Sequence, residues 1–140
     1  MSDPADPPEL PCPFCERLEE GRLVAQSEHA VAFPDGYPVS PGHHLVVSRR
    51  HAADFFELSA EEQADLWRLV AELRETLRHE LRPDGFNVGL NAGRAAGQTV
   101  MHVHVHLIPR WAGDVDDPRG GVRWVVPAKA RYWEWEGGAE

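Results

Sequence analysis

The sequence contains no long apolar run. Hydrophobic residues make up 42% of its 140 positions, yet no stretch approaches the roughly 20 consecutive apolar residues that a membrane-spanning helix requires. The first residues, MSDPADPPELP, also lack the basic start and the apolar core of a secretory signal. We therefore expect no membrane partner, and a cytoplasmic location.

Positive charge is scarce as well. The chain carries 14 Lys and Arg against 23 Asp and Glu, which gives a formal net charge of −9. Binding to a nucleic-acid polymer requires a basic surface, so this balance argues against DNA or RNA as a partner. It leaves open a small phosphate ligand, because backbone N–H groups and histidines can hold such a ligand locally.

Internal repeats are also missing, and the predicted elements fit one domain. A capping-box pattern of Ser59 and Glu62 starts a helix whose leucines recur at helical spacing as far as Leu81. Strands are expected at 22–26, 29–33, 43–48, 86–91, 99–109 and 122–126. Because these elements show no β-α-β alternation, they predict an α+β fold with an antiparallel sheet.

Three histidines stand out in the segment GQTVMHVHVHLIPR at 97–110. Side chains alternate in a strand, so His102, His104 and His106 are expected to share one face. They fit partly exposed polar positions, a zinc site, or phosphoryl chemistry, since neutral imidazole is a good nucleophile near pH 7. The glycine-containing turn before the strand offers backbone N–H groups to an anion and favours phosphoryl chemistry.

The only two cysteines are Cys12 and Cys15, in the sequence PCPFC. Their spacing is compatible with a redox pair, with two unrelated buried thiols, or with two of the four ligands of a structural zinc. No thioredoxin-like β-α-β pattern surrounds them, which weakens the redox interpretation. A closed zinc site would need two further ligands, which histidines would supply.

The triad segment resembles the signature of the histidine triad (HIT) family, H-φ-H-φ-H-φ-φ with φ apolar. Upstream, Asn91-x-Gly93 and the Gly97-Gln98 pair match as well, and DGYPVSPGH (35–43) with HLVVSRRH (44–51) resembles the first nucleotide-binding segment of the family. The resemblance covers about residues 12–110. It implies a HIT-like fold, an antiparallel sheet of about five strands with one long and one short helix, continued across a homodimer.

This resemblance divides the chain into a flexible leader at 1–10, a HIT domain at 11–113 and a C-terminal extension at 114–140. The extension has no counterpart in the triad pattern. Its tryptophans suit either contacts with a partner subunit or the substrate, or ordinary packing against the sheet; they are Trp124, Trp133 and Trp135.

The resemblance also implies a reaction. HIT proteins bind a nucleoside 5′-phosphate and transfer its nucleotidyl group through a covalent nucleotidyl-histidine. The nucleophile of the family matches His104, and His106 matches the residue that contacts the α-phosphate. Gln98 is expected to donate to the bridging or leaving oxygen, and backbone N–H groups near Gln98 and Thr99 are expected to stabilise the developing charge.

Further positions match residues that line the nucleotide pocket of the family. Asp35 matches the ribose-binding position and Phe33 the apolar wall for the base, while His43, Asn91 and Gly97 match other lining residues. From the residues alone, Asp35 in Asp-Gly also suits a simple turn. Phe33 also suits the core, and Asn91 the end of its strand.

Many HIT proteins carry a CxxC near the N-terminus and bind zinc with it, and this chain resembles that bacterial type. The resemblance implies a structural Zn²⁺ held by Cys12, Cys15, His51 and His102.

Two branches of the family, which act on different substrates, are compatible with the sequence. The run that ends in Pro109-Arg110 is similar to the Fhit-like branch, which hydrolyses dinucleoside polyphosphates such as diadenosine tri- or tetraphosphate and releases AMP. The Hint-like branch, which acts on purine nucleoside phosphoramidates, usually has glycines there. A phosphorylase, and a nucleotide-binding module with little turnover, remain alternatives.

Overall fold

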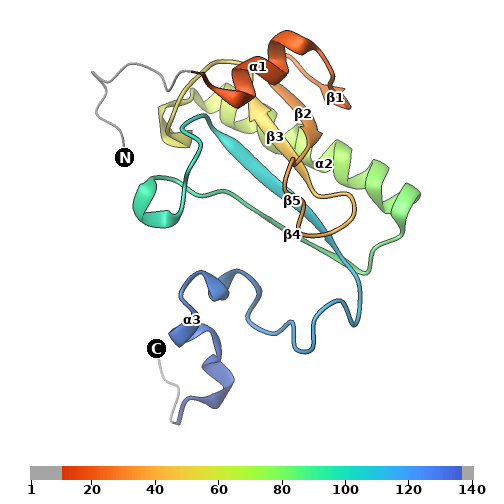
Figure 1. The fold of residues 1–140 in the computed structure, drawn as a ribbon, viewed down its shortest axis with the longest axis vertical. Coiled ribbons are helices and arrows are strands. Elements are labelled where there is room, and N and C mark those ends of the chain that lie inside the picture. Colours follow the sequence, from red (N-terminus) through yellow and green to blue (C-terminus); the bar gives the residue numbers. More distant parts are fainter. Residues whose placement is uncertain (1–10, 137–140) are drawn as a thin grey trace.

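The computed structural model describes residues 11–136, so the leader expected at 1–10 lies outside the described residues. Five strands form one sheet in the order β1-β2-β3-β5-β4, and every neighbouring pair is antiparallel (Figure 1). The strands are β1 (Ala25–Gln26), β2 (Ala30–Pro34), β3 (His44–Ser48), β4 (Gly85–Gly89) and β5 (His104–Arg110). The predicted α+β fold with a five-stranded antiparallel sheet is confirmed.

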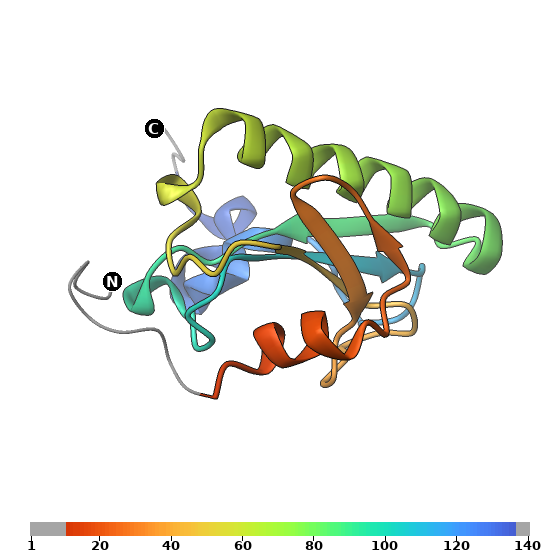
Figure 2. The same cartoon turned by 90° about the horizontal axis from the view of Figure 1, so that it is seen from above.

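The long helix α2 (Ala60–Leu81) covers one face of this sheet (Figure 2). It starts at the predicted capping box, in which the Ser59 hydroxyl accepts from the Glu62 N–H and the Glu62 carboxylate accepts from the Ser59 N–H. Its buried side chains join the inward residues of the strands in the main core. That core includes Leu66, Leu69, Leu73, Leu77, Val46, Val103, Val105 and Leu107.

A short helix, α1 (Pro13–Glu20), lies against the opposite face of the sheet (Figure 2). Cys12 caps its N-terminus by accepting from the Cys15 N–H at 3.4 Å, and Pro13 occupies its first turn. Gly21 ends it in the left-handed conformation with φ of 72°. Phe14 carries α1 into a second buried cluster that also contains Phe33 and strand residues Val31, Leu45 and Val47.

The strand β5 begins later than the predicted strand at 99–109. The segment before it bonds to the end of β3 and to the loop that follows, because the Val103 carbonyl accepts from the Ser48 N–H at 3.3 Å and the Val103 N–H donates to the Ala52 carbonyl at 2.8 Å. His102 therefore lies outside the strand and is fully buried, while His104 and His106 occupy alternate strand positions.

The C-terminal segment folds into short helical turns: η3 (Gly121–Val125), α3 (Pro127–Ala130) and η4 (Tyr132–Glu134). The predicted strand at 122–126 is wrong. Gly120 and Gly121 both have positive φ, which curls the backbone at its start, and Pro127 opens a helix at its end. Figure 1 shows the segment beyond the end of β5, away from α1.

Two further short turns complete the described chain, η1 (Phe55–Glu57) and η2 (Arg94–Ala96). Within residues 11–136, none of the helices combines the length and apolarity that crossing a bilayer would require.

Candidate functional site

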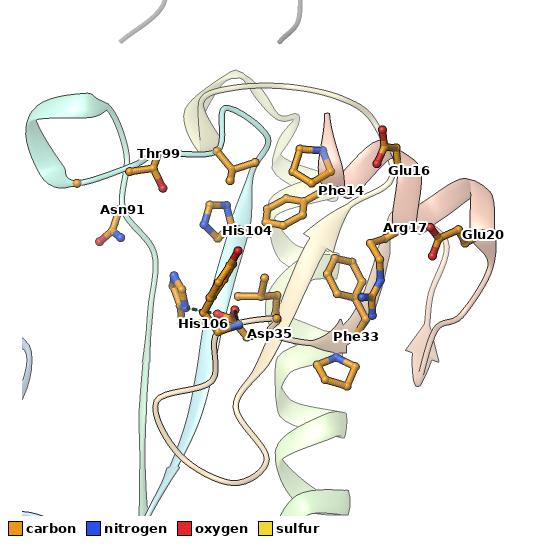
Figure 3. A pocket seen from close by; sticks show the side chains of 17 residues that line it. Phe14, Glu16, Arg17, Glu20, Phe33, Asp35, Asn91, Thr99, His104 and His106 are labelled. Carbon is orange, nitrogen blue, oxygen red and sulfur yellow. Dashed lines mark hydrogen bonds and ion pairs between the residues drawn. The ribbon is translucent and has the colours of Figure 1, made fainter. Parts of the chain in front are cut away.

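A cavity of about 540 Å³ opens between α1, the loop after β2 and the start of β5 (Figure 3). One side of it is apolar and the other carries imidazole, carboxylate and amide groups. Its lining includes Phe14, Glu16, Arg17, Glu20, Phe33, Asp35, Tyr37, Leu45, Asn91, Gly97, Thr99, Val100, His104 and His106. Such a pocket, with an apolar wall and a few convergent polar groups, is typical of small-molecule sites.

His104 has one ring nitrogen engaged and one available. Its Nδ1–H donates to the backbone carbonyl of His102 at 2.8 Å, which leaves the lone pair on Nε2. The ring is 9% exposed and burial lowers its pKa below the usual value of 6.5. Neutral imidazole with a free lone pair, in the wall of a cavity, is a competent nucleophile.

His106 has the opposite arrangement. The Val39 N–H donates to Nδ1 of His43 at 3.1 Å, so neutral His43 carries its proton on Nε2. That Nε2 lies 2.9 Å from Nδ1 of His106 and 3.2 Å from the Asp35 carboxylate. Nδ1 of His106 thus accepts, and neutral His106 carries its own proton on Nε2. Burial lowers the pKa of His106 to about 4, which keeps the ring neutral at pH 7.

The two neighbouring imidazoles therefore offer different groups to a ligand. His43 is buried and bonds to Nδ1 of His106, which leaves an N–H donor on Nε2 of His106. The His102 carbonyl holds Nδ1 of His104, which leaves a lone pair on Nε2 of His104. Their ring centroids lie 5.2 Å apart. The pair is suited to an electrophile with an attached oxyanion, because one ring can attack and the other can donate.

The side chain of Gln98 is held by backbone groups and does not line the cavity. Its side-chain oxygen accepts from the Gly93 N–H at 2.8 Å, and its amide donates to the carbonyls of Ala53 at 2.7 Å and Val100 at 3.1 Å. The side chain is 4% exposed and is absent from the lining of the cavity. This geometry does not support the expected contact with a leaving oxygen, because the side-chain amide is hydrogen-bonded to backbone groups of Gly93, Ala53 and Val100.

The other expected nucleotide-binding residues come together. Seven of them line the cavity: Phe33, Asp35, Asn91, Gly97, Thr99, His104 and His106. The eighth, His43, does not line this cavity, but its Nε2 lies within hydrogen-bonding distance of His106 and Asp35. Sequence reasoning missed the wall that α1 supplies, above all Phe14 and Arg17. The proline after Cys12 and the glycine at position 21 were signals for that helix.

Cys12, Cys15, His51 and His102 form a cluster whose ligand atoms all lie within 4.8 Å of one another. Nδ1 of His102 lies 3.5 Å from the Cys12 sulfur and 3.6 Å from the Cys15 sulfur, and Nδ1 of His51 lies 3.3 Å from the Cys15 sulfur. Two thiols and two imidazole nitrogens are the donor set of closed tetrahedral metal sites. The four residues can hold a metal ion.

The surroundings of the cluster fit a metal. The Nε2–H of His102 donates to the Ser48 carbonyl at 2.7 Å, which fixes Nδ1 as the nitrogen that faces the sulfurs. Burial lowers the pKa of His102 to about 4 and raises that of Cys15 to about 11. Without a cation the Cys15 thiol therefore stays protonated at pH 7, and a bound metal would favour its thiolate.

The cluster and the cavity share structural parts. The backbone carbonyl of His102 holds the ring of His104, while its side chain belongs to the cluster. Phe14, between the two cysteines, contacts the rings of His104, His102 and Phe33 edge-on, with centroids 5.0, 5.9 and 5.7 Å apart. The position of the cluster therefore also constrains the ring of His104 and the apolar wall.

Residues 17–113, more than half of the chain, match the model of the HIT domain. The chain belongs to the HIT family. An AP-4-A phosphorylase of Mycobacterium tuberculosis is 39% identical to this HIT protein over 99 residues, covering 70% of this chain and 51% of the relative. The adenosine 5′-monophosphoramidase of Schizosaccharomyces pombe is 38% identical over 105 residues, covering 72% of this chain and 75% of the relative.

Solved structures confirm the HIT-like fold. A HIT family protein from Bacillus anthracis superposes with a TM-score of 0.67 at 38% identity, covering 72% of this chain and 74% of that one. A Zn-bound histidine triad family protein from Mycobacterium smegmatis gives a TM-score of 0.69 at 28% identity, covering 86% of this chain and 94% of that one.

Proposed function

We propose that this HIT protein is a nucleotidyl hydrolase that forms a covalent nucleotidyl intermediate on His104. The observation that carries the proposal is the state of this one ring. Its Nδ1 is fixed by the His102 carbonyl, and its unprotonated Nε2 belongs to the wall of a cavity of nucleotide size.

The reaction divides into two displacements. Nε2 of His104 forms a bond to the α-phosphorus, and the bond from phosphorus to the bridging oxygen breaks, with the electron pair leaving on that oxygen. Water then forms a bond to phosphorus, the N–P bond breaks, and the electron pair returns to Nε2 while the proton of water is released. Together the two steps replace the slow direct attack of water on the α-phosphorus with two easier displacements.

Other residues bind and orient the nucleotide. The Nε2–H of His106 and the backbone N–H groups near Thr99 donate to the α-phosphate oxygens, where charge develops. Asp35 accepts from the ribose hydroxyls, and Phe33 and Phe14 form the apolar wall for the base. Asn91, which lines the cavity where Gln98 does not, takes the role of donor to the bridging oxygen.

For the substrate we propose a dinucleoside polyphosphate such as diadenosine tetraphosphate, with AMP released. The similarity to the AP-4-A phosphorylase of Mycobacterium tuberculosis supports this class and also makes phosphate an alternative to water as the acceptor. The similarity to the monophosphoramidase of Schizosaccharomyces pombe supports a second candidate, a nucleoside phosphoramidate, because the pocket would hold the same nucleoside monophosphate half.

We further propose that the metal of the Cys12, Cys15, His51 and His102 cluster is structural zinc. The donor set and the Zn-bound relative from Mycobacterium smegmatis support zinc. With four protein ligands the site keeps no open position, so its contribution is to fasten α1 to the segment that carries His102. No chemical step passes through it.

The homodimer, the domain limits at 11–113 and 114–140, and the cytoplasmic location stay predictions. A contact of Trp124, Trp133 and Trp135 with a second subunit or with the substrate also stays a prediction.

The experiment that tests the mechanism is intact-mass analysis after a brief acid quench with diadenosine tetraphosphate. We expect an adduct of nucleotidyl mass on the wild type and none on His104→Ala. We also expect AMP release from the variant to fall about 10³-fold or more. His79→Ala, a histidine on the exposed surface of α2, is the matched control and should form the adduct.

A parallel assay with an adenosine phosphoramidate distinguishes the two candidate substrates. Tight AMP binding without release of AMP from either substrate, and without any adduct, would leave only a nucleotide-binding module. An adduct that persists in His104→Ala would contradict the assignment of the nucleophile.

A further inference from the structure

Arg17 lies in the nucleotide cavity with unused hydrogen-bonding capacity. Its guanidinium carbon sits 4.5 Å from the centroid of the Phe33 ring, and both residues line the cavity (Figure 3). The Nε atom of Arg17 is buried and, among the residues that the structure describes, has no hydrogen-bond partner. Nε is covered, but the terminal Nη groups of Arg17 also have no hydrogen-bond partner among the described residues and are not buried. A ligand in the cavity that brings acceptors to these donors is therefore favoured.

The neighbouring acidic groups do not use this capacity. Glu20 pairs with Arg22 at 2.7 Å, which lowers the pKa of the Glu20 carboxyl. Glu16 also lines the cavity, but it is exposed and forms no ion pair with Arg17 among the described residues. Arg17 is thus the charged side chain that is both packed on the aromatic wall and still able to donate.

The chemistry of the purines gives this donor a preference. Guanine presents two acceptors, O6 and N7, on one edge, and arginine is the side chain that most often binds this pair. Adenine presents N7 beside the N6 amino group, which is itself a donor and meets the N–H groups of arginine unfavourably. A base in the cavity beside the Arg17–Phe33 pair would bring its edge within reach of the guanidinium.

We propose that Arg17 selects the base of the nucleotide by donating to O6 and N7 of guanine, so that 6-oxopurine nucleotides are preferred to adenine nucleotides. This inference rests on the proposed function for the location of the nucleotide, and it replaces adenine by guanine as the better base. The cation–π contact with Phe33 holds the guanidinium in place for this role.

The test is calorimetric titration of the full chain with four monophosphates. GMP and IMP both carry O6 and N7, and we expect them to bind about tenfold or more tightly than AMP. We expect 7-deaza-GMP, which lacks the N7 acceptor, to lose most of this advantage. These comparisons use the wild type alone and so remain informative if a variant does not fold.

Two variants assign the effect. Arg17→Met keeps the unbranched stem and removes the donors, so GMP, IMP and AMP should then bind with similar affinity. Arg78→Met, on the exposed side of α2, removes the same charge elsewhere and should keep the wild-type ratio.

Equal affinities in the wild type, tighter binding of AMP, no binding of any of the four, or a GMP preference that survives Arg17→Met would each overturn the inference. The proposed hydrolase is tested separately by the adduct on His104. Adduct formation without a base preference would therefore refute only the role of Arg17, and a base preference without an adduct would refute only the hydrolase.

Discussion

At the scale of single residues, the site depends on which ring nitrogen carries the proton. The sequence indicated that His104 and His106 matter, and the alternation of the strand was sufficient for that. The tautomers could not be predicted, because the groups that fix them come from Val39 and His43, which lie more than 60 positions earlier, and from the His102 carbonyl.

Gln98 illustrates the same limit, since a motif match does not say where a side chain points. We expect Gln98→Met to lower the free energy of unfolding by about 2–4 kcal/mol, because the variant leaves the backbone groups of Gly93, Ala53 and Val100 without partners. Urea unfolding measures this loss.

The chemistry itself should survive that substitution. At a temperature where Gln98→Met is folded, the acid-quenched variant should still carry the nucleotidyl adduct. Full stability combined with loss of the adduct would instead restore Gln98 to direct contact with the substrate.

His106 gives a pH dependence with a defined sign. Its pKa is lowered from 6.5 to about 4, with burial as the largest cause, so between these values the unfolded chain binds more protons than the folded protein. The stabilisation is complete above about pH 6.5 and is lost as the pH falls toward 4.

We therefore expect the thermal midpoint of the wild type to fall more steeply from pH 7 to pH 4.5 than that of His106→Asn. Scanning calorimetry at matched pH values provides the comparison, with His79→Asn as the control that keeps the wild-type slope. Parallel slopes for the wild type and His106→Asn would show that His106 does not titrate in this window.

At the scale of elements, helices and strands with a regular apolar pattern were predictable from the sequence, and a short helix held by tertiary contacts was not. The capping box and the spaced leucines located α2 correctly, and the hairpin of β1 and β2 followed from two apolar runs. The resemblance implied one short helix without bounds, and the residues alone did not locate α1. It has only eight residues, so packing of Phe14 and the Cys12 cap determine it more than any periodicity does.

Removal of the metal should act on this helix. We expect chelation, or Cys15→Ser, to lower the thermal midpoint and to increase hydrogen exchange in α1 selectively, because α1 is joined to the sheet by Phe14 and by the cluster. Nucleotide affinity should decrease as well, since α1 forms one wall of the cavity.

Exchange in α2 serves as the internal reference, because its core contacts lie on the other face of the sheet. Metal analysis of the purified chain should give one equivalent of zinc. Unchanged exchange in α1 after complete removal of the metal would show that the cluster does not fasten this helix.

At the scale of the whole molecule, the machinery and the C-terminal segment are separable. Within residues 11–136, no residue that lines the cavity lies beyond His106, and the hydrogen bonds of Arg123 and Trp124 remain within the segment itself. Its exposed apolar side chains include Val122, Val125 and Tyr132.

We expect truncation after Asp116 to leave GMP and AMP affinities unchanged within a factor of about two. If the segment contacts a second subunit, the same truncation should reduce the particle size in analytical ultracentrifugation. A truncated chain that keeps its size would exclude this segment from the interface, and one that loses affinity would place it in the site.

The alternation within β5 has a consequence for how such a protein loses its activity. Insertion or deletion of a single residue between His104 and His106 would place the two imidazoles on opposite faces of the strand, one toward the cavity and one toward the core under α2. The altered chain would have almost the same composition but would no longer present the lone pair and the N–H donor side by side. When related sequences are searched for members that have lost activity, the spacing of these two histidines is thus a better criterion than their presence.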